Sequence, residues 1–373
     1  MRWVYAIAGT LLLALVAFNI WIWVNDHTYV YRAFWHLHST IYDYHIFENR
    51  TVEKGDELVI PEHAMYNREA LPDTIENRLI ENNTTAFLIL KDGEILYENY
   101  WGSGNKDTLS NSFSMAKTIV ALLTGIAKDK GYIESLDDPV SKYYPPYREK
   151  GRETITIRHL LNMRSGLYWQ ETYDRPFNKT TEAYYGTDLP GLINRLKPEN
   201  RPGEKFDYSS GDTQVLGLML KEITGNNLSR LASENLWKPL GAGKDALWSL
   251  DRKGGNEKAY CCFHSTARDF ARLGMLINNE GVWGDDTLVN PAYVRNMRKP
   301  APSGEINFYR KKTWLFPVID GQQAFYLRGL HGQYVIGIPE LDAVAVRLGH
   351  DWEPMMGAHP ADAVLIARFL VNF

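Results

Sequence analysis

Residues 111–120 predict a helix that presents a serine and a lysine on one face. Apolar residues recur behind them at helical spacing until Gly131 ends the run; they are Phe113, Ile119, Val120, Leu122, Leu123 and Ile126. Residues three apart share a helix face, so the Lys117 amine can reach the Ser114 hydroxyl. A serine needs a neighbouring base to act as a nucleophile, and a buried lysine of lowered pKa can be that base. The stretch therefore predicts a serine nucleophile at a helix N-terminus, whose free N–H groups also favour an oxyanion.

A second serine–lysine pair, Ser103 and Lys106, has the same spacing. It stands in a loop with Gly104 and Asn105, where residues three apart need not be in contact. A pair at this spacing also arises by chance, as an N-cap serine followed by a solvated lysine. The interpretation of Ser114 therefore depends on partner motifs elsewhere in the chain.

Composition excludes some classes of function. The 373 residues are 45% hydrophobic and 23% charged, with a formal net charge of -4. This balance is typical of one large globular domain or two closely packed ones, and nothing is basic enough to indicate nucleic-acid binding. His36, His38 and His45 come without the carboxylate spacing of a metal site, so we expect neither a metal nor a cofactor.

Residues 3–24 form an almost uninterrupted apolar run, about the length that crosses a bilayer. The run ends in alternating Ile and Trp followed by Asn25 and Asp26, which is typical of an interfacial belt and a poor cleavage site. We therefore predict a retained single-pass anchor over residues 1–27, with a removed signal peptide as the alternative. Arg2 favours a cytoplasmic N-terminus, which would place the rest on the periplasmic side of a bacterial inner membrane.

Two further features lie outside the predicted anchor. Residues 28–70 are aromatic and polar, and we predict a juxtamembrane linker that packs on the following domain. Cys261 and Cys262 are adjacent and are the only cysteines. In most disulfides the two Cα atoms are further apart than those of neighbouring residues. We therefore expect two small buried thiols and no disulfide.

The remaining pattern predicts an α/β (α+β) domain over residues 71–373, with an antiparallel sheet flanked by helices. Residues 84–101 indicate a hairpin around the Asp92–Gly93 turn. Apolar runs near 314–318, 324–328, 333–338 and 342–348 predict a meander, and 360–371 an amphipathic helix that covers it. Between them, helices near 157–163, 189–196, 211–224, 228–237 and 265–279 predict a mostly helical lobe over about 130–300, inserted between the halves of the sheet.

Two further segments could bring chemistry to a cleft. Tyr208 stands in an extended piece just before a helix, and a tyrosine beside a cationic lysine can ionise more readily and act as a general base or proton relay. His331 follows Gly329 near the start of a strand, where glycine lets a substrate backbone approach closely. Each segment alone has a structural alternative, because 22 tyrosines make such a motif common and a lone histidine is more often structural.

Three motifs follow one another around the helical lobe: Ser114-x-x-Lys117, Tyr208-x-Ser210 and His331-Gly332-Gln333. Together they resemble the serine β-lactamase and penicillin-binding-protein superfamily, in the class C-like branch with carboxylesterases, D-amino-acid peptidases and 6-aminohexanoate-dimer hydrolases. Residues 155–166 and 265–274 resemble the framework of that family. The resemblance covers roughly residues 70–373.

The resemblance implies a role for each motif. Ser114 would be acylated, Lys117 would take or shuttle its proton, and Tyr208 would assist as base and then as acid to the leaving group. The N–H of Ser114, with one from the strand after His331, would form the oxyanion hole. Ser210 and the His331–Gln333 motif would line the substrate site.

Two departures from the family pattern narrow the expected substrate. Ser210 stands where β-lactamases of this branch usually carry asparagine, and His331-Gly332-Gln333 stands where β-lactamases and transpeptidases have Lys-Thr-Gly. Without that lysine the usual anchor for a β-lactam or peptide carboxylate is missing, so we expect an ester or amide, or a short peptide, instead of an antibiotic. The alternatives are a D,D-peptidase or weak β-lactamase and, from another class, a membrane-tethered binding module without catalysis. An α/β-hydrolase is excluded because the chain has no G-x-S-x-G motif.

Overall fold

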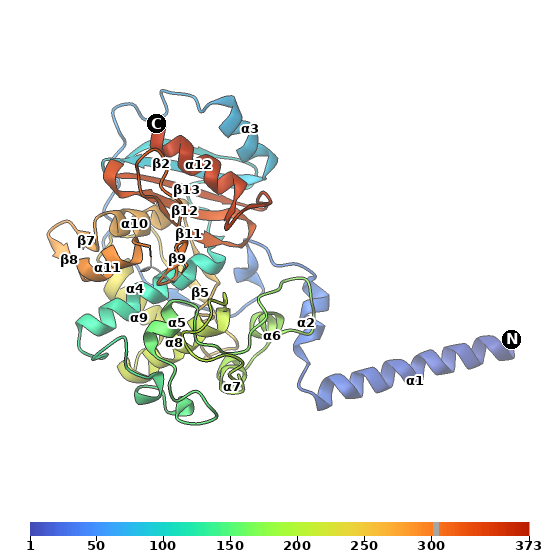
Figure 1. Cartoon of the computed structure of the whole chain (residues 1–373). Helices are drawn as coiled ribbons and strands as arrows, with labels where there is room; N and C mark the ends of the chain where they lie inside the picture. The colour runs from blue at the N-terminus through green and yellow to red at the C-terminus, as the bar shows by residue number, and fades with distance from the viewer. Residues whose placement is uncertain (301–305, 373) are drawn as a thin grey trace.

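The computed structural model describes residues 1–300 and 306–372. Its centre is a seven-stranded antiparallel sheet in the order β3-β2-β13-β12-β11-β10-β9 (Figure 1). The strands are β2 (Thr84–Lys91), β3 (Glu94–Tyr100), β9 (Tyr309–Arg310), β10 (Thr313–Leu315), β11 (Phe325–Gly329), β12 (Gln333–Ile338) and β13 (Ala343–Gly349). The predicted hairpin and meander are therefore confirmed. They form one sheet because β2 pairs with β13, with Leu88 opposite Val346.

The hairpin turn and the sheet faces follow from local sequence. Asp92 and Gly93 both have positive φ, 51° and 80°, as the tight two-residue turn between right-twisted strands requires. Both faces of β2 are buried, as its nearly continuous apolar run indicates, because helices cover the sheet on both sides. On one side lie α3 (Asp73–Glu81) and α12 (Ala361–Asn372), which confirms the predicted C-terminal helix.

The other face of the sheet is covered by α10 (Ala267–Asn278). A Cβ atom on Gly274 would lie 2.7 Å from Val344 and 2.8 Å from Val335, so this glycine lets the helix approach the sheet closely. The helix forms where the sequence predicts it, but it packs on the sheet and does not belong to the helical lobe to which we assigned it. Its apolar stripe faces strands β2, β12 and β13.

The helical lobe lies below the sheet in Figure 1 and is crossed by the helix that follows Ser114. Its helices are α4 (Ala116–Asp129), α5 (Ile157–Leu161), α6 (Lys179–Tyr185), α7 (Leu189–Asn194), α8 (Ser210–Thr224), α9 (Leu228–Ala232) and α11 (Pro291–Met297). Side chains cap several of them; Thr156 accepts from the His159 N–H at the start of α5, as its sequence suggests. Helix α4 packs against α8 and α9, and its residues 116–127 are all buried.

A second sheet joins segments that lie far apart in the sequence. Its four strands run in the order β1-β5-β6-β4, with β1 (Asn49–Val52), β5 (Ala246–Ser249), β6 (Phe263–Ser265) and β4 (Ser110–Asn111). Strand β1 belongs to the predicted linker, so residues 28–70 do more than connect: they supply an edge strand to the folded domain. Two-stranded ribbons are formed by β7 (Val282–Trp283) with β8 (Asp286–Thr287), and by β14 (Met355–Met356) with β15 (His359–Pro360).

The N-terminal helix α1 (Arg2–Val24) projects away from the folded body (Figure 1). Among its residues only Ile22 is buried. Its length and apolar composition suffice to cross a membrane, and it is the one helix of the described residues that meets this test. A short helix, α2 (Tyr29–His36), follows four residues later and packs beside α6.

Candidate active site

Ser114 lies in a tight turn between strand β4 and helix α4. The turn, η2 (Phe113–Met115), is a single 3-10 turn that continues directly into α4. Phe113 has a positive φ of 42°, and its N–H donates to Asn111 Oδ1 at 2.9 Å. Residue Ser112 is tied to β6 by a backbone hydrogen bond of 2.8 Å to Phe263. The predicted helix start is confirmed, and this bend leaves Ser114 partly exposed in a cavity.

Lys117 contacts Ser114 as the helix spacing predicts. Its Nζ donates to Ser114 Oγ at 2.7 Å and to the Tyr260 carbonyl oxygen at 3.1 Å. Burial of the amine, 1% exposed, lowers the pKa of Lys117 from 10.5 to about 8, against the opposing charge of Glu171. About a tenth of this amine is therefore neutral at pH 7 and can accept a proton, far more than of a free lysine. By contrast, the serine of the second pair, Ser103, is exposed, and its hydroxyl forms a hydrogen bond with the hydroxyl of Tyr42.

Tyr208 lies beside this pair, in the extended segment before α8 that the sequence predicts. Its ring centre is 5.0 Å from Lys117 Nζ, and its ring packs against Trp314 at 5.5 Å. Burial and the charge of Glu171 raise the pKa of Tyr208, although a hydrogen bond with Ser114 opposes the shift. The expectation that Tyr208 ionises easily is therefore wrong. The phenol stays neutral, so it is suited to donate a proton, and Lys117 is the better base.

A carboxylate that the sequence analysis missed, Glu171, lies at the N-terminus of α8. It accepts hydrogen bonds from Trp169 Nε1 at 2.7 Å and from the Tyr173 hydroxyl at 2.8 Å. It also accepts from the N–H of Ser210 at 2.8 Å and from its hydroxyl at 2.7 Å. Ser210 thus holds Glu171, and both residues line the same cavity as Ser114. An acidic residue alternating with two aromatic ones, W-x-E-x-Y, is the signal in the sequence that could have indicated it.

The third motif is divided between the cavity wall and the interior. His331 lines the cavity, and its Nε2 lies 3.0 Å from the Ser39 carbonyl oxygen in the predicted linker. Burial lowers the pKa of His331, and its ring packs edge-on against Phe113 at 5.2 Å. Gln333 is fully buried and its Nε2 donates to the Gly349 carbonyl oxygen at 2.6 Å. The Gln333 side chain therefore holds the backbone of the third motif from the protein interior and does not line the cavity.

Gly332 and Gly329 shape the backbone around the third motif. A Cβ on Gly332, whose φ is 71°, would lie 1.6 Å from the Arg347 guanidinium that bonds to this turn. A Cβ on Gly329 would lie 2.2 Å from the carbonyl oxygen of Ser112, so β11 closely approaches the turn η2 that contains Ser114. We expected the strand after His331 to lie at Ser114. The strand that chiefly borders η2 is β11, which precedes His331.

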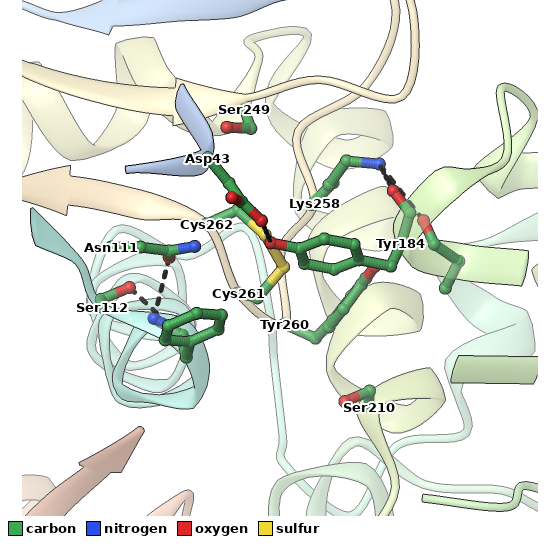
Figure 2. Close-up of a disulfide and its surroundings, with 12 residues drawn as sticks. Asp43, Asn111, Ser112, Tyr184, Ser210, Ser249, Lys258, Tyr260, Cys261 and Cys262 are labelled. Carbon is green, nitrogen blue, oxygen red and sulfur yellow. Dashed lines mark hydrogen bonds between the residues drawn. A yellow bond between two sulfur atoms is a disulfide. The ribbon is translucent and has the colours of Figure 1, made fainter. Parts of the chain in front are cut away.

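A disulfide between the adjacent Cys261 and Cys262 lies beside these residues (Figure 2). The prediction of two free thiols is wrong. The Cα atoms are 3.8 Å apart, and a positive φ of 66° at Cys262 lets the two side chains turn toward each other. Both cysteines are buried, and Cys261, Tyr184 and Ser210 line the same cavity. The two cysteines directly follow Tyr260. The carbonyl oxygen of Tyr260 accepts the hydrogen bond from Lys117 Nζ.

The cavity that contains Ser114 has a volume of about 590 Å³. Its walls come from α2, η2, residues 171–176, α6 and residues 330–331. Aromatic and aliphatic side chains dominate the lining, and Glu171 and Arg175 are among its few charged groups. Among the described residues no group of three His, Cys, Asp or Glu side chains is placed to hold a metal ion.

The family assignment rests on a match of the Beta-lactamase family model to residues 73–368, most of the chain. The chain belongs to the beta-lactamase family. Its seven-stranded sheet, its helical lobe and the position of Ser114 between them are thus features of a beta-lactamase-like serine hydrolase. The expected family is confirmed.

Three relatives show how far this beta-lactamase family member resembles known proteins. It is 27% identical over 306 residues to a 6-aminohexanoate-dimer hydrolase of Paenarthrobacter ureafaciens, covering 74% of this chain and 75% of that one. It is 29% identical over 211 residues to an Escherichia coli K12 protein assigned as a D-alanyl-D-alanine carboxypeptidase, covering 48% of each. A Bacillus anthracis structure assigned as a 6-aminohexanoate-dimer hydrolase superposes with a TM-score of 0.76 at 20% identity, covering 90% of this chain and 94% of that one.

Proposed function

We propose that the protein hydrolyses an ester or amide through an acyl-enzyme formed on Ser114. The observation that carries this proposal is the 2.7 Å hydrogen bond between Lys117 Nζ and Ser114 Oγ, made by an amine whose pKa burial lowers to about 8. A weakly basic amine against a serine hydroxyl is an activated nucleophile. A role as a binding module without chemistry would not require this arrangement.

Each of the three groups has a defined part in the first half of the reaction. Neutral Lys117 accepts the Ser114 proton while Ser114 Oγ bonds to the substrate carbonyl carbon. The N–H groups of Ser114 and of the backbone at the end of β11 stabilise the oxyanion. As the intermediate collapses, Tyr208 gives its proton to the leaving oxygen or nitrogen and regains one from Lys117.

The second half of the reaction releases the acyl group. A water molecule loses a proton to Lys117 and attacks the acyl carbonyl carbon. The bond between that carbon and Ser114 Oγ then breaks, and Oγ regains its proton from Lys117. All atoms and protons balance, so no metal or cofactor enters this scheme. The enzyme returns to its starting state with one acid and one alcohol or amine as products.

The side chains around Ser114 support this substrate class. His331, Gly332 and Gln333 replace the Lys-Thr-Gly of β-lactamases, and the structure uses Gln333 internally. The site therefore lacks that anchor for a carboxylate, which favours a carboxylesterase or amidase over a β-lactamase. Similarity to a 6-aminohexanoate-dimer hydrolase supports an amide among the substrates. The second candidate is a D,D-peptidase, favoured by similarity to the Escherichia coli protein across 48% of each chain.

We also propose that α1 anchors the enzyme in a bacterial inner membrane with the hydrolase domain on the periplasmic side. The support is the 23-residue apolar helix, of which the folded body buries a single residue. A helix of this length rises about 34 Å, enough for the apolar core of a bilayer.

Covalent labelling tests the proposed chemistry. The full-length protein in detergent is treated with a fluorophosphonate and its intact mass is measured, beside Ser114→Ala, Tyr208→Phe and the matched control Ser103→Ala. We expect one adduct that persists in Ser103→Ala and disappears in Ser114→Ala, with Tyr208→Phe labelled more slowly. An unlabelled, folded wild-type protein would contradict the proposal and favour a binding module.

A further inference from the structure

Helix α2 has an apolar outer face that the rest of the molecule leaves uncovered. Tyr29 and Val30 are buried against the domain, whereas Tyr31, Phe34 and Trp35 point outward. Trp35 is 83% exposed and Phe34 is 52% exposed, and Leu37 directly after the helix is 71% exposed. Exposed residues at positions 31, 34 and 35 share one side of a helix. So large an apolar patch marks a contact surface.

This face is continuous with the apolar helix α1. Only residues 25–28 separate the two helices, and the hydroxyl of Tyr31 donates to Asn19 Oδ1 in α1 at 2.6 Å. Trp21 and Trp23 near the end of α1 are exposed as well. A short amphipathic helix that follows a membrane span, with aromatic residues on its free side, has the properties of a helix lying at a bilayer surface.

Two segments that line the active-site cavity reach the same end of α1. Ala33, Phe34 and Leu37 line the cavity. Residues 173–176 also line it, and the next residue, Phe177, packs against Trp21 of α1 with ring centres 5.5 Å apart. The cavity that contains Ser114 is thus bordered by the two segments that contact the predicted span.

We propose that the cavity opens onto the bilayer surface and that the substrate is a membrane-resident amphiphile, with its ester or amide near the lipid–water boundary. This inference rests on the proposed hydrolase function and names its substrate class. The apolar chain of the amphiphile follows Phe34 and Leu37, while its carbonyl reaches Ser114. Ester and amide groups of amphiphiles lie at the depth where α2 lies, so the substrate need not leave the membrane to react.

The first experiment measures membrane contact without using hydrolysis. The full chain is placed in phospholipid nanodiscs with Trp35→Cys carrying an environment-sensitive fluorophore, and Val318→Cys as the matched control. Val318 is 63% exposed on the segment before β11, and the native cysteines are bonded to each other and buried. We expect spin-labelled lipid to quench the fluorophore at position 35 several-fold more than at 318. Equal quenching would overturn the proposal.

The second experiment measures how the substrate arrives. Hydrolysis of p-nitrophenyl dodecanoate dissolved in the nanodisc bilayer is compared with hydrolysis of water-soluble p-nitrophenyl acetate, which reports whether the site is intact. We expect the dodecanoate-to-acetate ratio of kcat/KM to fall about tenfold in Trp35→Glu and to stay near the wild-type value in Val318→Glu. An unchanged ratio in Trp35→Glu would overturn the proposal.

The two readouts separate failure of this inference from failure of the proposed function. If the fluorophore at position 35 is quenched but the wild-type protein hydrolyses neither ester and Ser114 is not labelled by the fluorophosphonate, the hydrolase function fails and this substrate class fails with it. If acetate is hydrolysed and position 35 is not quenched, only the membrane route fails.

Discussion

Lys117 and Tyr260 are joined by a hydrogen bond of 3.1 Å from the lysine Nζ to the tyrosine carbonyl oxygen. Tyr260 directly precedes the disulfide of Cys261 and Cys262, so the carbonyl group that accepts from Lys117 and the disulfide belong to one backbone segment (Figure 2). The amine is held between this carbonyl and Ser114 Oγ. Its orientation therefore depends on a segment more than 140 residues further along the chain.

Opening the disulfide is expected to slow acylation of Ser114. Without the bond the backbone at Tyr260 has more conformational freedom, and the carbonyl that orients Lys117 is held less well. We expect the rate of fluorophosphonate labelling to fall several-fold after reduction under mildly denaturing conditions followed by refolding with the thiols blocked. The double variant Cys261→Ala/Cys262→Ala serves as the control, because its labelling rate should not respond to reductant. Equal rates in the oxidised and reduced wild-type protein would contradict this prediction.

The pH dependence of acylation is expected to report the titration of Lys117. Its amine must be neutral to accept the Ser114 proton, and burial sets the pKa at about 8. The rate should therefore rise with pH to a plateau above about 8 and fall about tenfold per unit below it. Labelling rates measured between about pH 5 and pH 10 test this. A rate that is flat across this range would show that another group is the base.

Replacing Glu171 with glutamine is expected to move that pH profile toward lower pH. The negative charge of Glu171 raises the pKa of Lys117, so its removal lowers that pKa and leaves the amine neutral at lower pH. The amide of the Glu171→Gln variant would keep an oxygen for some of the donors that hold the carboxylate. Glu204→Gln, at an exposed position, is the control and should leave the midpoint in place. A shift toward higher pH, or none, would contradict the prediction.

Gly332→Ala is expected to destabilise the fold more than Gly321→Ala. Both glycines have positive φ, 71° and 84°, so alanine is strained at either position, by about 1–2 kcal/mol. A Cβ on Gly332 would also meet the Arg347 guanidinium at 1.6 Å, whereas nothing lies within 4 Å at Gly321. Overpacking adds about 1–3 kcal/mol, so we expect a larger fall in melting temperature for Gly332→Ala. Equal melting temperatures would show that Arg347 moves aside freely.

Local sequence patterns were sufficient where the structure depends on residues close together in the chain. The spacing of Ser114 and Lys117 predicted their contact because a helix brings residues three apart together. The hairpin around Asp92 and Gly93 was predictable because that turn favours such residues. The order of three short motifs was enough to predict the family, although none of them would be enough alone.

The electrostatics of the site could not be predicted in this way. We expected Tyr208 to ionise readily beside a cationic lysine. In the folded protein burial and Glu171 raise its pKa, and the cation beside its ring is Lys117. The carboxylate itself was missed because its donors, Trp169, Tyr173 and Ser210, converge on it only in the folded chain.

The sequence by itself determined the hairpin, the C-terminal meander and its covering helix, the serine–lysine pair and the family of this protein, because each follows from local spacing or from short motifs. The tertiary structure alone decided that β1 completes a sheet, that β11 borders the turn of Ser114, and that adjacent cysteines bond next to the carbonyl that accepts from Lys117. It also decided that α2 forms a rim of the active-site cavity. These relationships join residues far apart in the chain, and they depend on burial and on a backbone path that no local pattern encodes.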